Sequence, residues 1–233
     1  MLLNTTNLLN TTTAFNTVFN TAFAGYAPTW ATIAMEAPST TGSNDYRWVG
    51  KLKGMREWIG ERDLGNLEQS GYTVRNKHFE NTVEVDRDDF EDDQIGLYTP
   101  MFADLGQTAA EHPDQLVFNL FRNADSTVCY DGQNFADTDH PVRDVAGAVQ
   151  SGSNFGGGAG EMWGLLVTNR PVKPFIYQPR KKAQFVALDN PDDPTVFLKN
   201  KLLYGVDGRW NAGVGLWQRA FFSRDTLNAD NYA

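Results

Sequence analysis

The chain has 233 residues, of which 41% are hydrophobic, and a formal net charge of −9. This length suits one large domain or two small ones with a real core. Its single cysteine, Cys129, excludes an intramolecular disulfide and a multi-cysteine zinc module, and it fits a reducing compartment. No Lys or Arg precedes Arg47 and no run of eighteen apolar residues occurs, so neither a secretion signal nor a membrane-spanning helix is predicted.

Charge is distributed unevenly along the chain. Residues 84–146 carry fifteen acids against three arginines, whereas residues 147–233 carry ten basic groups against seven acids. Phosphate contacts need clustered Lys and Arg, so nonspecific nucleic-acid binding is disfavoured as the main task. The asymmetry favours contact between unlike parts of the surface, within one chain or between copies.

The Asn- and Thr-rich opening predicts a helix that stops near Gly25. Its apolar residues recur at helical spacing: Phe15, Val18, Phe19, Ala22 and Phe23. This helix either packs on the protein's own core or is an arm that packs on a neighbouring subunit.

A long hairpin is predicted from Asp45 to Val85, with a turn near the sequence QSGY and an extended return from Tyr72. The return strand alternates poorly. One face carries Arg75, Lys77 and Phe79, and the other carries Asn76, His78 and Glu80. Because a polar two-stranded ribbon is marginal alone, we expect it to be a flap over the body or to lie on another subunit.

The stretch VEVDRDDFEDDQIG, residues 83–96, holds seven carboxylates. It fails the EF-hand template, since Phe90 and Glu91 stand where a ligand and a glycine are required. Asp86 and Asp88 could bind a divalent ion as a short acidic motif. The favoured interpretation is a helix start: Asp88 or Asp89 caps the first turn, and the acids that follow lie at the positive end of the helix dipole.

After the acidic stretch, one apolar stripe indicates a long helix. It is formed by Ile95, Tyr98, Phe102, Leu105 and Ala109. Pro100 is expected to kink this helix, Gly96 and Gly106 to weaken it, and a second helix is predicted to start at Pro113.

The sequence CYDGQNFADTDHPV places Cys129, Asp131, Asp137, Asp139 and His140 close together. A cysteine nucleophile needs a histidine and an orienting third group, and zinc needs three or four good ligands, whereas only one histidine is near. Asp-Gly and His-Pro are turn signals, so a loop is favoured. No catalytic residue, metal site or cofactor is predicted.

Glycines dominate residues 147–164, and this stretch lacks the Gly-Lys-Ser/Thr ending of a phosphate loop, so a flexible connection is expected. Short strands are then predicted at VKPFIYQ, AQFVAL, TVFLK, KLLYGV and AGVGLWQRAFF. Helices first and strands after favour an α+β fold.

Long blocks of the sequence resemble the Mu-like phage major head subunit family, gpT. They are APSTTGSNDYRWVGKLKGMREWIGER, GYTVRNKHFENTVEVDRDDFEDDQIGLYTPMFADLGQTAAEHPDQLVFNLF, CYDGQNFADTDHPV, and VKPFIYQPRKKAQFVAL through YGVDGRWNAGVGLWQRAFF. The resemblance runs in order from about residue 15 to the end of the sequence. It implies a Hong Kong 97-type capsid fold with an N-terminal arm, an extended hairpin loop, a long spine helix, a peripheral domain and a partial axial domain.

The resemblance also implies an organisation along the chain. Residues 1–44 would be the arm, 45–87 the extended loop, 88–146 a peripheral domain with the spine helix, 147–170 the glycine-rich connection, 171–224 peripheral-domain strands, and 225–233 the start of a C-terminal segment that family members continue. We expect residues 225–233 to be frayed, and closed shells to need the longer segment.

The function implied is that of a major capsid protein, without enzymatic activity, that self-assembles through pentamers and hexamers into an icosahedral phage shell enclosing DNA. Expected partners are other copies, a scaffold and protease, a portal protein, and DNA by nonspecific contact only; no membrane is involved. The shell would form in the bacterial host cytoplasm and become the virion capsid. Assembly-interface candidates are Phe15, Phe19, Phe23, Arg75, Lys77, Phe79, Arg180, Lys181 and Lys182.

Two alternatives stay open from the residues alone. One is a metal-dependent hydrolase using the acidic stretch 84–93, with Asp86, Asp88 and His140 as its functional groups. The other is a non-viral shell protein of the same fold that encloses an enzyme cargo.

Overall fold

The computed structural model describes residues 3–46, 71–143, 148–190 and 192–228. The chain forms two compact units, each made of three separate segments. Unit 1 comprises Met1–Thr29, Asn76–Gln115 and Pro179–Trp210, and unit 2 comprises Trp30–Arg75, Leu116–Gln178 and Asn211–Ala233. The division falls within three long elements: α3 (Thr99–Arg122), β9 (Phe175–Leu188) and β10 (Lys201–Val214).

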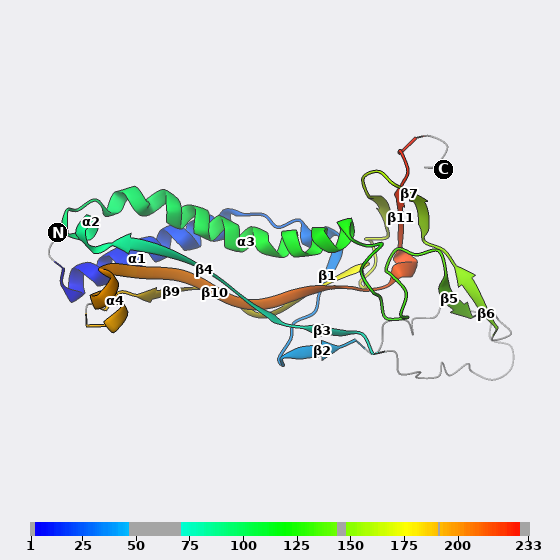
Figure 1. Ribbon diagram of the computed structural model, residues 1–233, viewed down its shortest axis with the longest axis horizontal. Helices are drawn as coiled ribbons and strands as arrows, with labels where there is room; N and C mark the ends of the chain where they lie inside the picture. The colour runs from blue at the N-terminus through cyan, green and yellow to red at the C-terminus, as the bar shows by residue number, and fades with distance from the viewer. Residues whose placement is uncertain (1–2, 47–70, 144–147, 191, 229–233) are drawn as a thin grey trace. The chain divides into compact units, whose positions relative to one another are not determined.

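In unit 1, the two long helices α1 (Thr5–Gly25) and α3 cover one face of a sheet (Figure 1). The other complete elements of this unit are β4 (Lys77–Asp86), α2 (Arg87–Glu91), η2 (Ile95–Tyr98) and α4 (Pro194–Lys199). Strand β10 lies between β9 and β4, and it pairs antiparallel with β4 from Lys201 opposite Asp86 to Trp210 opposite Lys77. Among the helices that the structure describes, none is long and apolar enough to cross a membrane.

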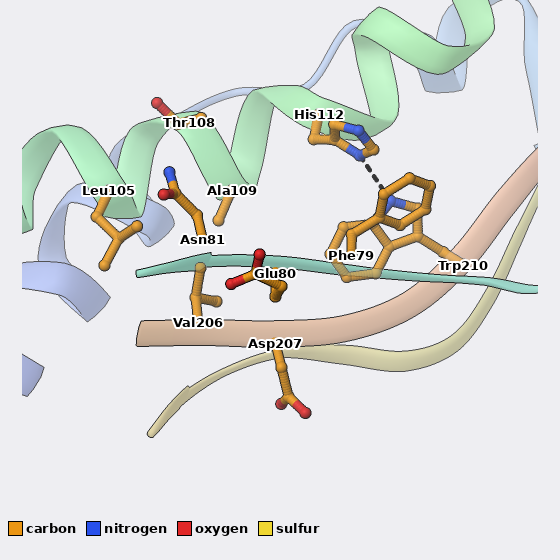
Figure 2. A pocket seen from close by; sticks show the side chains of 10 residues that line it. All are labelled: Phe79, Glu80, Asn81, Leu105, Thr108, Ala109, His112, Val206, Asp207 and Trp210. Atoms are coloured by element: carbon orange, nitrogen blue, oxygen red, sulfur yellow. Dashed lines mark hydrogen bonds between the residues drawn. The ribbon is translucent and has the colours of Figure 1, made fainter. Parts of the chain in front are cut away.

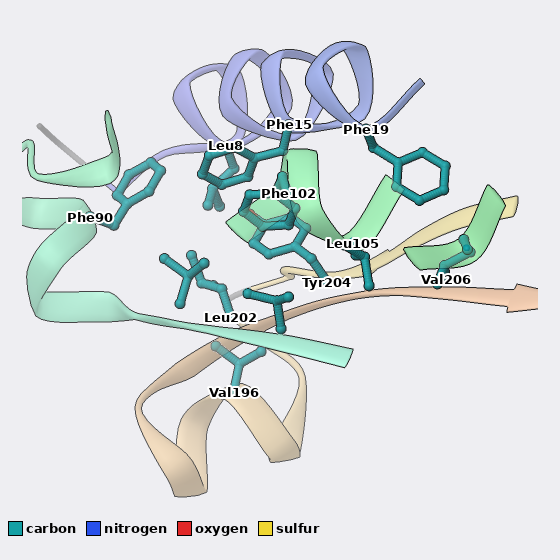
Figure 3. Packing of buried hydrophobic residues seen from close by; sticks show 13 residues of the cluster. Leu8, Phe15, Phe19, Phe90, Phe102, Leu105, Val196, Leu202, Tyr204 and Val206 are labelled. Carbon is teal, nitrogen blue, oxygen red and sulfur yellow. The ribbon is translucent and has the colours of Figure 1, made fainter. Parts of the chain in front are cut away.

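The core of unit 1 is aromatic and joins α1, α3 and the sheet (Figure 3). The rings of Phe15 in α1 and Phe102 in α3 stack with centroids 3.9 Å apart, and both meet the ring of Tyr204 in β10 edge-on, at 5.3 and 5.5 Å. Val83 and Val85 add the inward side chains of β4 at alternate positions, as a pleated strand requires. Two predictions are thus confirmed: the opening segment is a helix, and the return segment of the hairpin is extended.

The long helix starts later than the acidic stretch indicated. Asp86, rather than Asp88 or Asp89, caps a helix, and that helix is the five-residue α2: the Asp86 side chain accepts from the backbone N–H of Asp88 at 3.3 Å. The long helix α3 begins at Thr99. Pro100 is therefore its second residue, where a missing N–H costs nothing, and the helix is not interrupted there.

The prediction that a second helix starts at Pro113 is also wrong, because α3 continues through this proline to Arg122. A proline inside a helix removes one backbone hydrogen bond and crowds the carbonyl four residues before it, a cost that the packing around this stretch must offset. The neighbouring buried residues Asp114 and Val117 keep this stretch packed.

Unit 2 contains small sheets. Its complete elements are η1 (Trp30–Thr32), β1 (Ala34–Glu36), β2 (Ser43–Asp45), β3 (Thr73–Arg75), β5 (His140–Arg143), β6 (Val149–Gly152), β7 (Phe155–Gly158), β8 (Trp163–Leu166), η3 (Trp217–Arg219) and β11 (Ala220–Arg224). Strand β11 lies between β7 and β8, β5 pairs with β6, and β1 runs parallel to the start of β9. Strands β2 and β3 pair antiparallel, as expected for the base of the predicted hairpin, and residues 47–70 of that hairpin lie outside the described residues.

Three expectations for the second half of the chain are corrected. The glycine-rich stretch is not a plain connection, because β6, β7 and the start of β8 lie within it. TVFLK belongs to helix α4, whose Val196 is buried while the next two residues are exposed, and VKPFIYQ and AQFVAL contribute to one strand, β9. The predicted fraying of the C-terminal segment falls largely on residues 229–233, outside the described residues. The α+β class is confirmed.

Candidate assembly surface

The predicted interface residues of α1 lie in the core of their own unit. Phe15 is 4% exposed and Phe19 is 1% exposed. Phe23 is half-buried and packs against the ring of Phe19, with centroids 5.9 Å apart. Of the two alternatives for this helix, the structure therefore has the one that packs on its own core, and Phe15 and Phe19 are not available to a neighbour.

The three consecutive basic residues of β9, Arg180, Lys181 and Lys182, differ in whether their charge is paired within unit 1 or exposed. Lys181 is half-buried, and its ammonium group donates to both carboxylate oxygens of Asp207 in β10, at 2.7 and 3.0 Å. This hydrogen bond lowers the pKa of the Asp207 carboxyl against the opposing effect of burial, and His78, 3.4 Å away, lowers it further. Arg180 and Lys182 are exposed. Of the predicted basic triplet, these two are accessible to another molecule, whereas Lys181 is used within unit 1.

The three interface candidates of the predicted hairpin, Arg75, Lys77 and Phe79, also differ in their exposure to solvent. Lys77 is exposed at the start of β4 in unit 1, and Arg75 is exposed at the end of β3 in unit 2. Phe79 is half-buried between the rings of His112 and Trp210, with centroids 4.3 and 5.4 Å away. The side chain of Phe79 thus forms part of a pocket wall and does not project freely toward another subunit.

That pocket lies between α3 and strands β4 and β10 and has a volume of about 160 Å³ (Figure 2). Its walls are largely apolar and are formed by Phe79, Glu80, Asn81, Leu105, Thr108, Ala109, His112, Val206, Asp207 and Trp210. The indole N–H of Trp210 donates to Nδ1 of His112 at 2.9 Å, which makes this nitrogen an acceptor. Burial lowers the pKa of His112, in agreement with a neutral ring. Sequence reasoning missed this pair because 98 residues separate its members.

The most exposed large apolar side chains that the structure describes are in α4. Val196 is fully buried and anchors this short helix on the core (Figure 3), while Phe197 and Leu198 are 77% and 79% exposed. Asn200, directly after α4, donates from its side chain to Asp88 at 3.2 Å, and its carbonyl accepts from the N–H of Arg87 at 3.1 Å. The exposed apolar pair therefore belongs to the same end of unit 1 as the acidic helix α2.

The hydrolase alternative finds no support in the geometry. Within the described residues, no three His, Cys, Asp or Glu side chains are grouped so that they could hold a metal ion. Asp86 serves as the helix cap described above. The buried Cys129 has a pKa raised to about 12 by burial and by the charge of Asp131, so it is a thiol and not a nucleophilic thiolate.

Solved structures define the class of protein. A subunit from the procapsid of bacteriophage JBD30 is 42% identical, with a TM-score of 0.84 over 99% of this chain and 79% of the other. A subunit of the JBD30 capsid is 31% identical, with a TM-score of 0.68 over 84% of this chain and 65% of the other. The fold is that of the phage major capsid proteins of the Hong Kong 97-like type.

Curated relatives narrow the class to one family. The major capsid protein of Escherichia phage Mu is 43% identical over 205 residues, 85% of this chain and 67% of the relative. The Mu-like prophage FluMu major head subunit of Haemophilus influenzae is 41% identical over 93% of this chain and 73% of the relative. Residues 8–233 match the family Mu-like prophage major head subunit gpT, and the chain belongs to it. It is a structural capsid protein that assembles with copies of itself, and not an enzyme.

Proposed function

We propose that this chain forms an icosahedral shell of pentamers and hexamers that encloses phage DNA. The observation that supports this most directly is the likeness to the JBD30 procapsid subunit, which extends over 99% of the chain at 42% identity. The shell would be built in the bacterial cytoplasm with a scaffold and protease and a portal protein, and it would touch DNA only nonspecifically. The net charge of −9 agrees with weak, nonspecific contact to nucleic acid.

In this proposal unit 1 is the peripheral domain and α3 is its spine helix. Its support is the aromatic core that packs α1, α3 and the sheet of this unit together. Unit 2 would contribute to the axial domain. The part of the predicted loop 45–87 that precedes β4 would lie on a neighbouring subunit, because β4 itself pairs with β10 within unit 1. The proposed domains are thus built from segments far apart in the sequence, unlike the consecutive ranges that the resemblance implied.

Electron microscopy of the expressed chain, with and without the neighbouring genes, tests the proposal. Regular shells in at least one of these conditions are expected. Only dispersed subunits in every condition, from protein shown to be folded by circular dichroism, would contradict it. Particles that enclose an enzyme and exclude DNA when the neighbouring genes are present would favour the cargo-shell alternative.

The same proposal includes a contact surface on unit 1. Phe197 and Leu198 project from an end that also carries the exposed acid Asp88, whereas Arg180 and Lys182 are exposed on β9. Large exposed apolar side chains mark protein–protein contacts, and unlike charges select the partner surface. We therefore assign the acidic and apolar end of one copy to a contact with the basic face of another.

Two sets of variants test this contact separately. Replacing Phe197 and Leu198 by Ser should reduce shell formation while the free subunit stays folded, and Val128→Ser, at a side chain 60% exposed in unit 2, is the matched control. Arg180 and Lys182 should be changed to Glu with Lys181 retained, because Lys181 stabilises its own subunit. Shells that form unchanged, with the same dependence on salt, would show that this end is not a contact.

A further inference from the structure

His140 is a fully buried polar side chain at the junction of several segments of unit 2. Its Nδ1 lies 2.8 Å from Oδ2 of Asp131, and its Nε2 lies 3.2 Å from Oδ1 of Asn154. The indole of Trp217 stacks on the imidazole with ring centroids 3.9 Å apart and planes 8° from parallel. One side chain at the start of β5 thus contacts the loop at residue 131, the residue before β7, and η3.

The side chain of Asn154 can have only one orientation. Its Nδ2 donates to the carbonyl oxygens of Phe135 and Trp217 at 2.8 and 3.4 Å, and its Oδ1 accepts from the N–H of Asp137 at 2.9 Å. A flipped amide would place its oxygen against two carbonyl oxygens and its NH₂ group against an N–H. Oδ1 therefore faces His140 as an acceptor.

Both ring nitrogens of His140 consequently face acceptors. A neutral imidazole has one N–H donor and one lone pair, whereas an imidazolium has two donors. In the neutral form, the lone pair of one ring nitrogen would point at a carboxylate or carbonyl oxygen although the ring is fully buried, which is costly. The imidazolium satisfies both contacts, and its charge is favoured by Asp131 and by the face of Trp217.

We propose that His140 is a buried imidazolium that fastens these segments of unit 2 together, so that the packing of this unit depends on a proton. When the proton is lost, one of the two hydrogen bonds is replaced by a repulsion and the junction loosens. The shell subunit thereby carries a built-in response to pH, apart from any surface contact between copies.

The groups around the ring favour a positive charge on His140. Among the described residues, the titratable groups that face the ring or lie beside its partners include Asp131, Asp137, Asp139, Cys129 and Tyr130. The cation of η3, Arg219, donates to the carbonyl oxygen of Val172. Burial raises the pKa of Asp131, but the hydrogen bond and charge of His140 outweigh this and the pKa lies below its ordinary value. An ionised Asp131 in turn favours the charged form of the ring that it faces.

Nitrogen NMR of the unassembled 233-residue chain with labelled histidine is the direct test. The chain has three histidines, and single substitutions assign them. At neutral pH, His140 should show protons on both ring nitrogens, while His112, whose Nδ1 accepts from Trp210, should show one bare nitrogen. One bare nitrogen on His140 under the same conditions would overturn the proposal.

A second measurement compares the free energy of unfolding of the wild type with that of a variant whose junction needs no charged groups. In Asp131→Asn, the new amide can donate to a neutral ring, so no proton is needed. The free energy of unfolding of the wild type relative to this variant should fall as pH rises, because the wild-type junction needs a proton that the variant does not. His78→Gln, at a side chain 64% exposed, is the control and should leave that fall intact. A difference that does not change with pH would refute the proton dependence, and if Asp131→Asn fails to fold, the NMR result decides alone.

Discussion

Replacing Gly106 by Ala should destabilise unit 1, although the same change stabilises most helices. Gly106 lies in the interior of α3, where Ala is intrinsically better by about 1 kcal/mol. A Cβ at this position, however, would lie 2.4 Å from the carbonyl oxygen of Phe19 in α1 and 3.2 Å from the Cβ of Ala22. The nearest obstacle is backbone, so relief requires a shift of α1 and not a rotation of a side chain.

The magnitude follows from the difference between two effects. Overpacking of a well-packed contact costs about 1–3 kcal/mol. Because the obstacle at 2.4 Å is backbone, we expect the upper part of that range, about 2–3 kcal/mol, which exceeds the gain in helix propensity. We expect a net loss of about 1–2 kcal/mol in the free energy of unfolding. In urea this corresponds to a midpoint lower by roughly 0.5 M, if the free energy falls by about 3 kcal/mol per M.

Gly25→Ala is the matched control in the same unit. Gly25 is the last residue of α1, and a Cβ there would have no heavy atom within 4 Å. Its free energy of unfolding should stay within about 0.5 kcal/mol of wild type or rise. Equilibrium unfolding of the unassembled subunit, followed by circular dichroism, gives both values. A Gly106→Ala variant as stable as Gly25→Ala would refute the close contact between α1 and α3.

Three further outcomes follow from unit 1. Asp93→Asn should leave stability unchanged or raise it slightly, since Asp93 follows α2 with φ of 60°, a conformation that Asn adopts readily; a clear loss in a urea titration would argue for an ionic network. Val196→Ala should cost about 2 kcal/mol by the same measurement, because this fully buried side chain anchors α4, and no change would show that α4 is not held there. The Tyr26 phenol donates to Asp114 at 2.6 Å, and this hydrogen bond, with burial and the Asp114 charge, raises its pKa to about 12 from 10.0. Unfolded tyrosine ionises first, so stability should fall between about pH 10 and about pH 12, and in an absorbance titration Asp114→Asn should move one tyrosine to lower pH.

The parts of the fold that could be predicted from the sequence are those with a strong local pattern. Phe15 and Phe19 stand at helical spacing and are buried in α1, and the extended return strand is β4. The acidic stretch predicts a helix start because acidic side chains are stabilised at the positive end of a helix dipole. That argument holds for α2, which Asp86 caps, but local signals could not tell a five-residue helix from the beginning of α3.

The parts that could not be predicted depend on contacts distant in sequence. The segment TVFLK alternates weakly and favours a strand by composition, yet Val196 alone fits the core, and a helical turn buries it while leaving Phe197 outside. His140 and Asp131 are close in the sequence. The second acceptor of the ring, Asn154, lies in a glycine-rich stretch whose residue pattern does not indicate a contact with His140. The side-chain partners of buried polar groups are set by the tertiary fold, which residue spacing does not encode.

The discontinuous composition of unit 1 has a consequence for the order of events during synthesis. Its sheet pairs β4 with β10, and its core needs residues from α1, from α3 and from the segment 179–210. Helices α1 and α3 can form early, but they have no sheet to cover until residue 210 has left the ribosome. Chains emerge at about 5–20 residues per second, so the apolar side of α1 stays uncovered for roughly 10–40 seconds. Pairing across more than a hundred residues is also slow to nucleate. A chaperone that holds the emerging N-terminal helix should therefore raise the yield of folded subunits more than one that acts after release.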